Sequence, residues 1–137
     1  MIVSAITKGY FAMDRPKIWF MKMKRIEEVN FVEGINVLVG PTSFPSGHAM
    51  SAFALYSLIA FFLLKKKMVA VLFFVIALFI AISRVYLVHH FFEDILVGST
   101  IGVSLAMLIY YLQSLKTFPP GHWMDEPFFG KRKTPRV

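Results

Sequence analysis

The stretch Phe44–His48 (Phe-Pro-Ser-Gly-His) opens a run from Ala49 to Leu64 that contains no charged residue. Two more apolar runs follow, at about Met68–Leu87 and Ile95–Leu115. Each run is close to the ~20 residues that a helix needs to cross a bilayer. The composition agrees, with 57% hydrophobic residues and a mean hydropathy of +0.64. The sequence therefore predicts an all-α transmembrane helical bundle in which three helices span the membrane.

The start of the first of these helices carries unusual polar chemistry. Proline is favoured in the first turn of a helix, which predicts a helix starting at Pro45. Gly47 lets another group approach the backbone closely. The first N–H groups of a helix and the positive end of its dipole attract anions. The residues around His48 are therefore a candidate anion site at the mouth of a membrane helix.

Composition excludes several classes of function. The chain has no cysteine, which excludes disulfides, thiolate metal sites and cysteine nucleophiles. The net charge of +7 would suit nucleic acid, but the basic residues cluster beside the apolar runs. There they are expected to contact anionic lipid headgroups or to set the topology. We therefore expect membrane lipids, and no nucleic acid, as partners.

The remaining segments predict the domain organisation. Met1–Thr7 resembles the last turns of a helix that begins upstream, and Met21–Thr42 a solvated connection. A connection of that length often covers a functional site. Residues 1–116 form one membrane domain in this interpretation, and residues 117–137 a polar, basic tail.

The third apolar run carries a stripe of small residues at four-residue spacing. Gly98, Gly102 and Ala106 lie on one helix face, which allows close helix packing in lipid. Asp94 precedes Gly98 by one turn on nearly the same face. We therefore expect the Asp94 side chain to face the interior of the bundle.

Alternation of the helices across the membrane places the polar residues on one side. Ser46–His48, Arg84, His90 and Asp94 fall on that side, and the Lys65–Lys67 loop on the other. Lysine-rich short loops prefer the cytoplasm. This favours an extracytoplasmic position for the polar residues, although the Lys8–Arg25 region is also basic.

Arg84, His90 and His48 each have a plain structural interpretation when taken alone. A charge well inside the hydrocarbon costs ~2.5–3.5 kcal/mol, so Arg84 should face a partner or a cavity unless it reaches the headgroups. His90 and Asp94 are four residues apart, so the carboxylate can hold one imidazole nitrogen and make the other more nucleophilic. A surface hydrogen bond would use the same spacing, and His48 alone would suit the membrane interface.

Together these residues supply what phosphoryl transfer requires. The fixed positive charges come from Lys8, Arg15 and Arg84, and the neutral donors from Ser46 and the Gly47 backbone. His48 and His90 titrate near neutrality, as a nucleophile and an acid must. A zinc site is the competing interpretation, with ligands drawn from His48, His89, His90, Glu93 or Asp94. The three cations would repel zinc and remain unexplained by it.

Three motifs in this order resemble a known family. They are Lys8-x6-Arg15-Pro16, Pro45-Ser46-Gly47-His48 and Ser83-Arg84-x5-His90-x3-Asp94, spread over residues 8–94. The combination resembles the type 2 phosphatidic acid phosphatase superfamily, which includes the vanadium haloperoxidases. The membrane-embedded lipid phosphatase branch typically has six transmembrane helices, and this chain resembles the second half of that bundle.

The resemblance implies a mechanism and a set of roles. His90 would attack phosphorus to form a phosphohistidine, with Asp94 orienting it and His48 serving as acid and then base. Lys8, Arg15, Ser46, Gly47 and Arg84 would bind the phosphoryl oxygens. The resemblance implies a metal-independent phosphoric monoester or diphosphate hydrolase without a cofactor, in which vanadate can act as a phosphate analogue.

Two functions from different classes follow. One is an integral membrane hydrolase acting on a lipid phosphate or pyrophosphate of the phosphatidic acid, phosphatidylglycerophosphate or isoprenoid pyrophosphate type. The other is a truncated or inactive membrane scaffold that retains the phosphate-binding pocket. For the hydrolase we expect the bacterial inner (plasma) membrane, an active site on the extracytoplasmic side and possible homo-oligomers.

Overall fold

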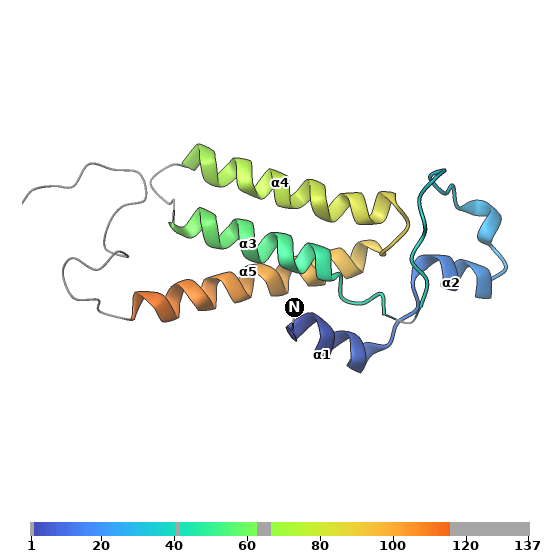
Figure 1. Ribbon diagram of the computed structural model, residues 1–137, viewed down its shortest axis with the longest axis horizontal. Coiled ribbons are helices and arrows are strands. Elements are labelled where there is room, and N and C mark those ends of the chain that lie inside the picture. The colour runs from blue at the N-terminus through green and yellow to red at the C-terminus, as the bar shows by residue number, and fades with distance from the viewer. Residues whose placement is uncertain (1, 41, 63–66, 116–137) are drawn as a thin grey trace, which may run out of the picture.

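The computed structural model describes residues 2–40, 42–62 and 67–115, in which helices joined by irregular segments are the only regular secondary structure (Figure 1). In chain order the elements are α1 (Ile2–Phe11), α2 (Pro16–Lys22), the 3₁₀ turn η1 (Ile26–Glu28), α3 (Gly47–Phe62), α4 (Lys67–Tyr86) and α5 (Phe92–Ser114). The described part of the chain contains no strand, which confirms the all-α class.

Helices α3, α4 and α5 are the three predicted membrane segments. Helices α4 and α5 are long and apolar enough to cross a bilayer, and α3 is a shorter apolar helix of 16 residues. Large apolar side chains on these helices point outward. They include Leu55, Val71, Leu72, Phe79, Leu96 and Met107. Such faces suit contact with lipid chains, because in lipid the hydrophobic effect does not favour burying apolar side chains between helices.

Helix α3 is the centre of the bundle. It packs closely on α4 along one side and on α5 along another, whereas α4 and α5 touch each other much less. The buried core is built largely from small residues on all three helices. Its members are Ala49, Ala52, Phe53, Ala77, Ala81 and Ile95. Small side chains let the helix backbones approach one another, as helix association in lipid requires.

The contact between α3 and α5 depends on the predicted stripe of small residues. Gly98, Gly102 and Ala106 are all buried, and the two glycines face the backbone of α3. A Cβ atom added at Gly98 would lie only 2.5 Å from the carbonyl oxygen of Ser46. One added at Gly102 would collide with the carbonyl oxygen of Met50. The interpretation of this stripe as a close-packing face is therefore confirmed.

The structure corrects two predicted boundaries. The helix expected from Pro45 starts at Gly47, and Pro45 precedes it after a cis peptide bond with Phe44. The segment expected as the end of a helix at Met1–Thr7 continues to Phe11, so Lys8 is helical. The motif spacing gave no signal for either boundary. The 117–137 tail, His122 and most of the Lys65–Lys67 loop lie outside the described residues.

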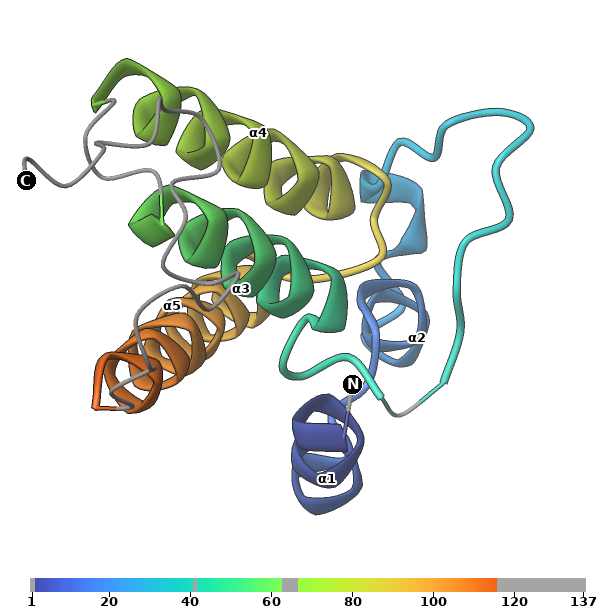
Figure 2. The same cartoon turned by 60° about the vertical axis from the view of Figure 1, so that its left-hand side comes forward.

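The N-terminal elements lie at one end of the bundle, beside the start of α3 (Figure 2). The backbone N–H of Ser43 donates to the carbonyl of Met13 at 2.9 Å, and that of Arg15 donates to Gly40 at 3.2 Å. The Trp19 ring packs edge-on against Phe91, with ring centroids 5.9 Å apart. These contacts attach the segment that contains Arg15 to the two segments that precede α3 and α5.

Candidate active site

One end of the bundle collects the buried polar side chains. Helices α3 and α5 begin there and α4 ends there, so all three segments with predicted site residues meet (Figure 1). The buried polar and charged residues are Arg15, Ser43, Ser46, His89, His90 and Asp94. Four of these six were predicted as site residues, and the shared end agrees with the topology inferred from the sequence.

His90 and Asp94 form a buried pair. The Nδ1 atom of His90 lies 3.2 Å from Oδ2 of Asp94, and the two side chains are 1% and 4% exposed. The surface hydrogen bond that the same spacing allows is therefore not what the fold contains. With Nδ1 held by a carboxylate, Nε2 is the nitrogen left for chemistry.

The Asp94 carboxylate is itself held by further donors. The backbone N–H of Phe91 donates to Oδ2 at 2.9 Å, as an N-cap of α5 would arrange it. The hydroxyl of Ser43 also donates to Oδ2 and lies 3.5 Å from Nδ1 of His90. Sequence reasoning missed Ser43. Its position next to the Phe44–His48 stretch was the one signal available, since the residue lies outside the three motifs.

Ser46 connects the start of α3 to α5. Its backbone N–H donates to the carbonyl of Asp94 at 2.9 Å, and its Oγ accepts the N–H of Ala49 at 3.4 Å. The amide of Ser46 is therefore occupied within the protein. Because the N–H of Ala49 is also bonded, the candidate anion site at this helix start is left with the amides of Gly47 and His48, which have no partner within the helix.

Arg15 is buried and bridges the segments before α3 and α5. One terminal nitrogen donates to the carbonyl of His89 at 3.0 Å, and the other to the carbonyl of Thr42 at 3.4 Å. Burial lowers the pKa of Arg15, while the charge of Asp94 acts in the opposite direction. A guanidinium remains protonated in proteins, so this is a fixed positive charge inside the site.

Arg84 anchors the backbone at the end of α4. Its carbonyl accepts the N–H groups of both His89 and His90, at 3.0 and 3.3 Å, and its Nε donates to the hydroxyl of Ser83 at 3.2 Å. The side chain is half-buried. Arg84 therefore orients the short connection from which His90 projects.

Lys8 and His48 complete the predicted set at longer range. Lys8 on α1 lies near enough to Arg15 and Asp94 for their charges to affect its pKa. His48 on α3 is exposed and lies near enough to Arg84 and His90 to interact with them electrostatically. The fold thus places these two residues around the buried cluster, with His48 on its open side.

His89 is buried next to His90 in the sequence, and in the part of the chain that the structure describes its imidazole ring lacks the hydrogen bonds that buried polar groups usually form. It is 7% exposed, and neither ring nitrogen has a hydrogen-bond partner within the described residues. Burial, followed by the charge of Arg84, lowers the pKa of His89, although the Asn36 backbone acts in the opposite direction. The ring is therefore expected to be neutral near pH 7. Within the described ranges, no three histidines or acidic residues gather as a metal site would require.

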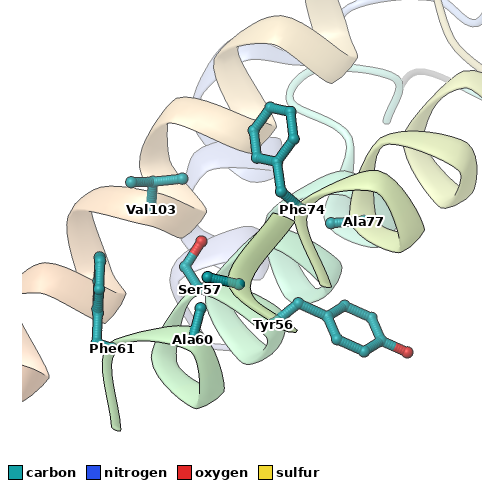
Figure 3. Close-up of a pocket in the computed structure, with 8 residues that line it drawn as sticks. Tyr56, Ser57, Ala60, Phe61, Phe74, Ala77 and Val103 are labelled. Atoms are coloured by element: carbon teal, nitrogen blue, oxygen red, sulfur yellow. The ribbon is translucent and has the colours of Figure 1, made fainter. Parts of the chain in front are cut away.

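A separate hollow of about 250 Å³ lies between α3, α4 and α5, away from these polar residues (Figure 3). Its lining is almost entirely apolar. The residues are Tyr56, Ser57, Ala60, Phe61, Ala70, Phe74, Ala77 and Val103. Its lining includes two hydroxyls, of Tyr56 and Ser57, but no charged side chain and no imidazole, so the polar end of the bundle is the candidate active site.

The family of the chain follows from comparison with known proteins. A model of the PAP2 superfamily matches residues 1–118. The chain therefore belongs to the PAP2 superfamily, and the resemblance carried by the three motifs is confirmed.

Two individual proteins are similar to part of this chain. Phosphatidylglycerophosphatase B of Bacillus subtilis (strain 168) is 47% identical over 75 residues, which cover 49% of this chain and 37% of the relative. A PA-phosphatase related-family protein of Dictyostelium discoideum is 33% identical over 94 residues, covering 58% of this chain and 35% of that protein.

A solved structure shares the fold. It is the crystal structure of a transmembrane PAP2 type phosphatidylglycerolphosphate phosphatase from Bacillus subtilis, with a TM-score of 0.54 and 32% identity. The match covers 86% of this chain and 61% of the solved one. Together with the apolar helices, it identifies the chain as an integral membrane protein. The chain spans just over a third of the two curated relatives' length.

Proposed function

We propose that this protein is a membrane phosphatase that hydrolyses a lipid phosphate through a phosphohistidine formed on His90. The observation that carries the proposal is the buried His90–Asp94 pair beside the guanidinium of Arg15. Arg15 is 7% exposed, donates to two neutral carbonyls and forms no ion pair within the described ranges. A buried charge without a counterion is costly. A phosphate would supply the missing negative charge beside the nucleophile.

The first half of the reaction transfers the phosphoryl group to the protein. Nε2 of His90 forms a bond to phosphorus, while the bond from phosphorus to the lipid oxygen breaks. Protonated His48 gives its proton to that oxygen, so the lipid leaves with a hydroxyl group in place of the phosphate. Asp94 stabilises the positive charge that develops on the His90 ring, since it accepts the Nδ1–H group.

The second half releases phosphate. His48, now neutral, takes a proton from a water molecule that attacks the phosphorus of the phosphohistidine. The bond from phosphorus to Nε2 breaks, and inorganic phosphate leaves. Arg15, Arg84 and Lys8, with the backbone at Gly47, would neutralise the phosphoryl oxygens in both steps.

A lipid substrate fits the position of the site. The helices α4 and α5 are membrane-spanning by length and composition, and the polar residues lie at one end of the bundle, near the expected headgroup level. The relatives named for phosphatidylglycerophosphate favour that substrate among the candidates. Phosphatidic acid and isoprenoid pyrophosphate remain the other members of the panel to test. We place the site on the extracytoplasmic side of a bacterial inner membrane.

The scaffold alternative predicts a different outcome in a binding experiment. A pocket that has lost its catalytic geometry would release no phosphate from any lipid of the panel. If it still held the anion, vanadate would raise the temperature of unfolding without any turnover. The two functions are therefore separable with one purified sample.

The decisive experiment measures phosphate release in mixed micelles containing a metal chelator. We expect the protein to act on phosphatidylglycerophosphate and to lose activity in His90→Ala and His48→Ala. His122→Ala is the matched control, because His122 lies beyond the residues that match the family model. An alkaline denaturing quench during turnover should trap a phosphoprotein that is stable in base and labile in acid in the parent, and none in His90→Ala. Unchanged phosphate release by His90→Ala would refute the mechanism.

A further inference from the structure

Ser43 occupies the centre of the buried cluster although it lies outside the three motifs. It is 1% exposed, and its hydroxyl donates to Oδ2 of Asp94 and lies 3.5 Å from Nδ1 of His90. We infer that Ser43 is a positioning residue that holds the Asp94 carboxylate and thereby keeps the His90 ring protonated on Nδ1. The inference rests on the proposed function in assigning His90 as the nucleophile.

The direction of the hydrogen bonds determines what Ser43 can do. A serine hydroxyl has a single proton to donate. The contact of Oγ with Asp94 is much shorter than the 3.5 Å contact with His90, so that proton belongs to the bond with Asp94. Nδ1 of His90 must then donate a proton of its own to Oδ2, 3.2 Å away. Nε2 is left with the lone pair that an attack on phosphorus requires.

Oδ2 of Asp94 is the acceptor for three donors. These are the hydroxyl of Ser43, Nδ1 of His90 and the backbone N–H of Phe91. Hydrogen bonds to a carboxylate favour its charged form, against the effect of burial. Without the Ser43 hydroxyl, the Asp94 carboxylate would keep only two of these three hydrogen bonds and would be freer to rotate. Rotation of the carboxylate away from Nδ1 would weaken its control over which nitrogen of His90 carries the proton.

The backbone around Ser43 fixes its hydroxyl in place. The N–H of Ser43 donates to the carbonyl of Met13 at 2.9 Å, and the neighbouring carbonyl of Thr42 accepts a bond from Arg15. The serine is therefore attached to the same segment that supplies the buried cation. Movement of the Arg15 segment would carry the Ser43 hydroxyl with it, which couples anion binding to the orientation of the nucleophile.

Two measurements test the role. The first is steady-state hydrolysis of phosphatidylglycerophosphate by Ser43→Ala, Ser43→Thr and the control Ser104→Ala. Ser104 is an exposed serine of α5 whose hydroxyl bonds to the Thr100 carbonyl. We expect Ser43→Ala to lower kcat about 10-fold or more with KM nearly unchanged, since the lost bond is to a charged group and not to substrate. Ser43→Thr keeps the hydroxyl and should recover most of kcat.

The second measurement does not depend on activity. Nitrogen-15 NMR of histidine-labelled protein reports which ring nitrogen is protonated, and His90→Ala assigns the His90 signals. We expect the Nδ1–H form in the parent and in Ser104→Ala, and a mixture of forms in Ser43→Ala. An unchanged ring form in Ser43→Ala, or a kcat close to that of the parent, would overturn the inference. If the parent releases no phosphate, the proposed function fails, and the NMR result alone decides the role of Ser43.

Discussion

Replacing Gly98 with alanine tests whether the packing of α3 on α5 sets the geometry of the active site. The added Cβ would lie 2.5 Å from the carbonyl oxygen of Ser46 and 3.4 Å from both Cβ of Ala49 and N of Met50. Side-chain Cβ atoms essentially never approach another atom within 3.0 Å. The obstructing atom belongs to the backbone, so the start of α3 must move away from α5 by at least the difference, 0.5 Å.

This displacement acts where the site is assembled. The N–H of Ser46 donates to the Asp94 carbonyl at 2.9 Å, so separating the helices lengthens that bond. We expect overpacking to lower the free energy of unfolding by about 1–3 kcal/mol. Because a misplacement of ~1 Å can cost ~100-fold in rate, half of that displacement should lower kcat/KM by about 10-fold. Thermal unfolding in detergent and phosphate release measure the two effects on the same sample.

Gly9→Ala is the matched control for this experiment. A Cβ at Gly9 would meet no atom within 4 Å, and the residue is exposed on α1. Alanine is favoured over glycine in a helix by about 0.5–1 kcal/mol, so the control should be neutral or slightly stabilising. The reasoning is refuted if Gly98→Ala unfolds at the temperature of the control and retains its kcat/KM.

Four further outcomes are expected. Arg15→Lys should lower kcat/KM about 10-fold or more in the phosphate-release assay, because an ammonium cannot hold both carbonyls as the guanidinium does; the exposed control Lys24→Arg should not. Orthovanadate should inhibit competitively and raise the unfolding temperature of the parent, and failure of both would contradict an anion site. Below about pH 6.5 the unfolded chain protonates His89 before the folded protein does, because burial lowers the pKa of His89 in the fold. The free energy of unfolding should therefore decrease as the pH is lowered through that range, and it should decrease less steeply in His89→Asn. Equal pH dependence in the parent and in His89→Asn would disprove the lowered pKa of His89. Since the chain has no cysteine, Glu93→Cys is a unique label site, and a membrane-impermeant maleimide should modify it in intact cells if the site is extracytoplasmic.

Much of the fold was predictable because lipid imposes simple length and composition rules. The predicted helix at Met68–Leu87 is observed as Lys67–Tyr86, one residue away at each end. Asp94 was expected to face inward from its place on the Gly98 stripe, and it is 3% exposed. In both cases the regular geometry of the helix lets a pattern in the sequence predict where a segment or a side chain lies.

Ser43 and the start of α3 show what sequence patterns do not contain. The Pro45 prediction used a helix preference, but the chain turns at a cis bond before Pro45 and the helix starts two residues later. Ser43 lies in irregular backbone, where no period assigns a direction to a side chain. Its contact with Asp94 joins residues 51 positions apart and depends on how α3 packs against α5. Such contacts follow from tertiary packing, which local sequence does not specify.

The small-residue stripe and the chemistry share one helix for a physical reason. Asp94 lies in the first turn of α5 and Gly98 follows one turn later, so the backbone that must approach α3 is the backbone that carries the carboxylate. Without a Cβ at Gly98, the amide of Ser46 reaches the carbonyl of Asp94, and Ser43 reaches its side chain. Arg15 then adds a buried positive charge bound only to neutral carbonyls within the described residues. The contact between α3 and α5 thus holds an oriented histidine near a buried cation that makes no ion pair within the described residues, and an anion that reacts with the histidine would also pair with that cation.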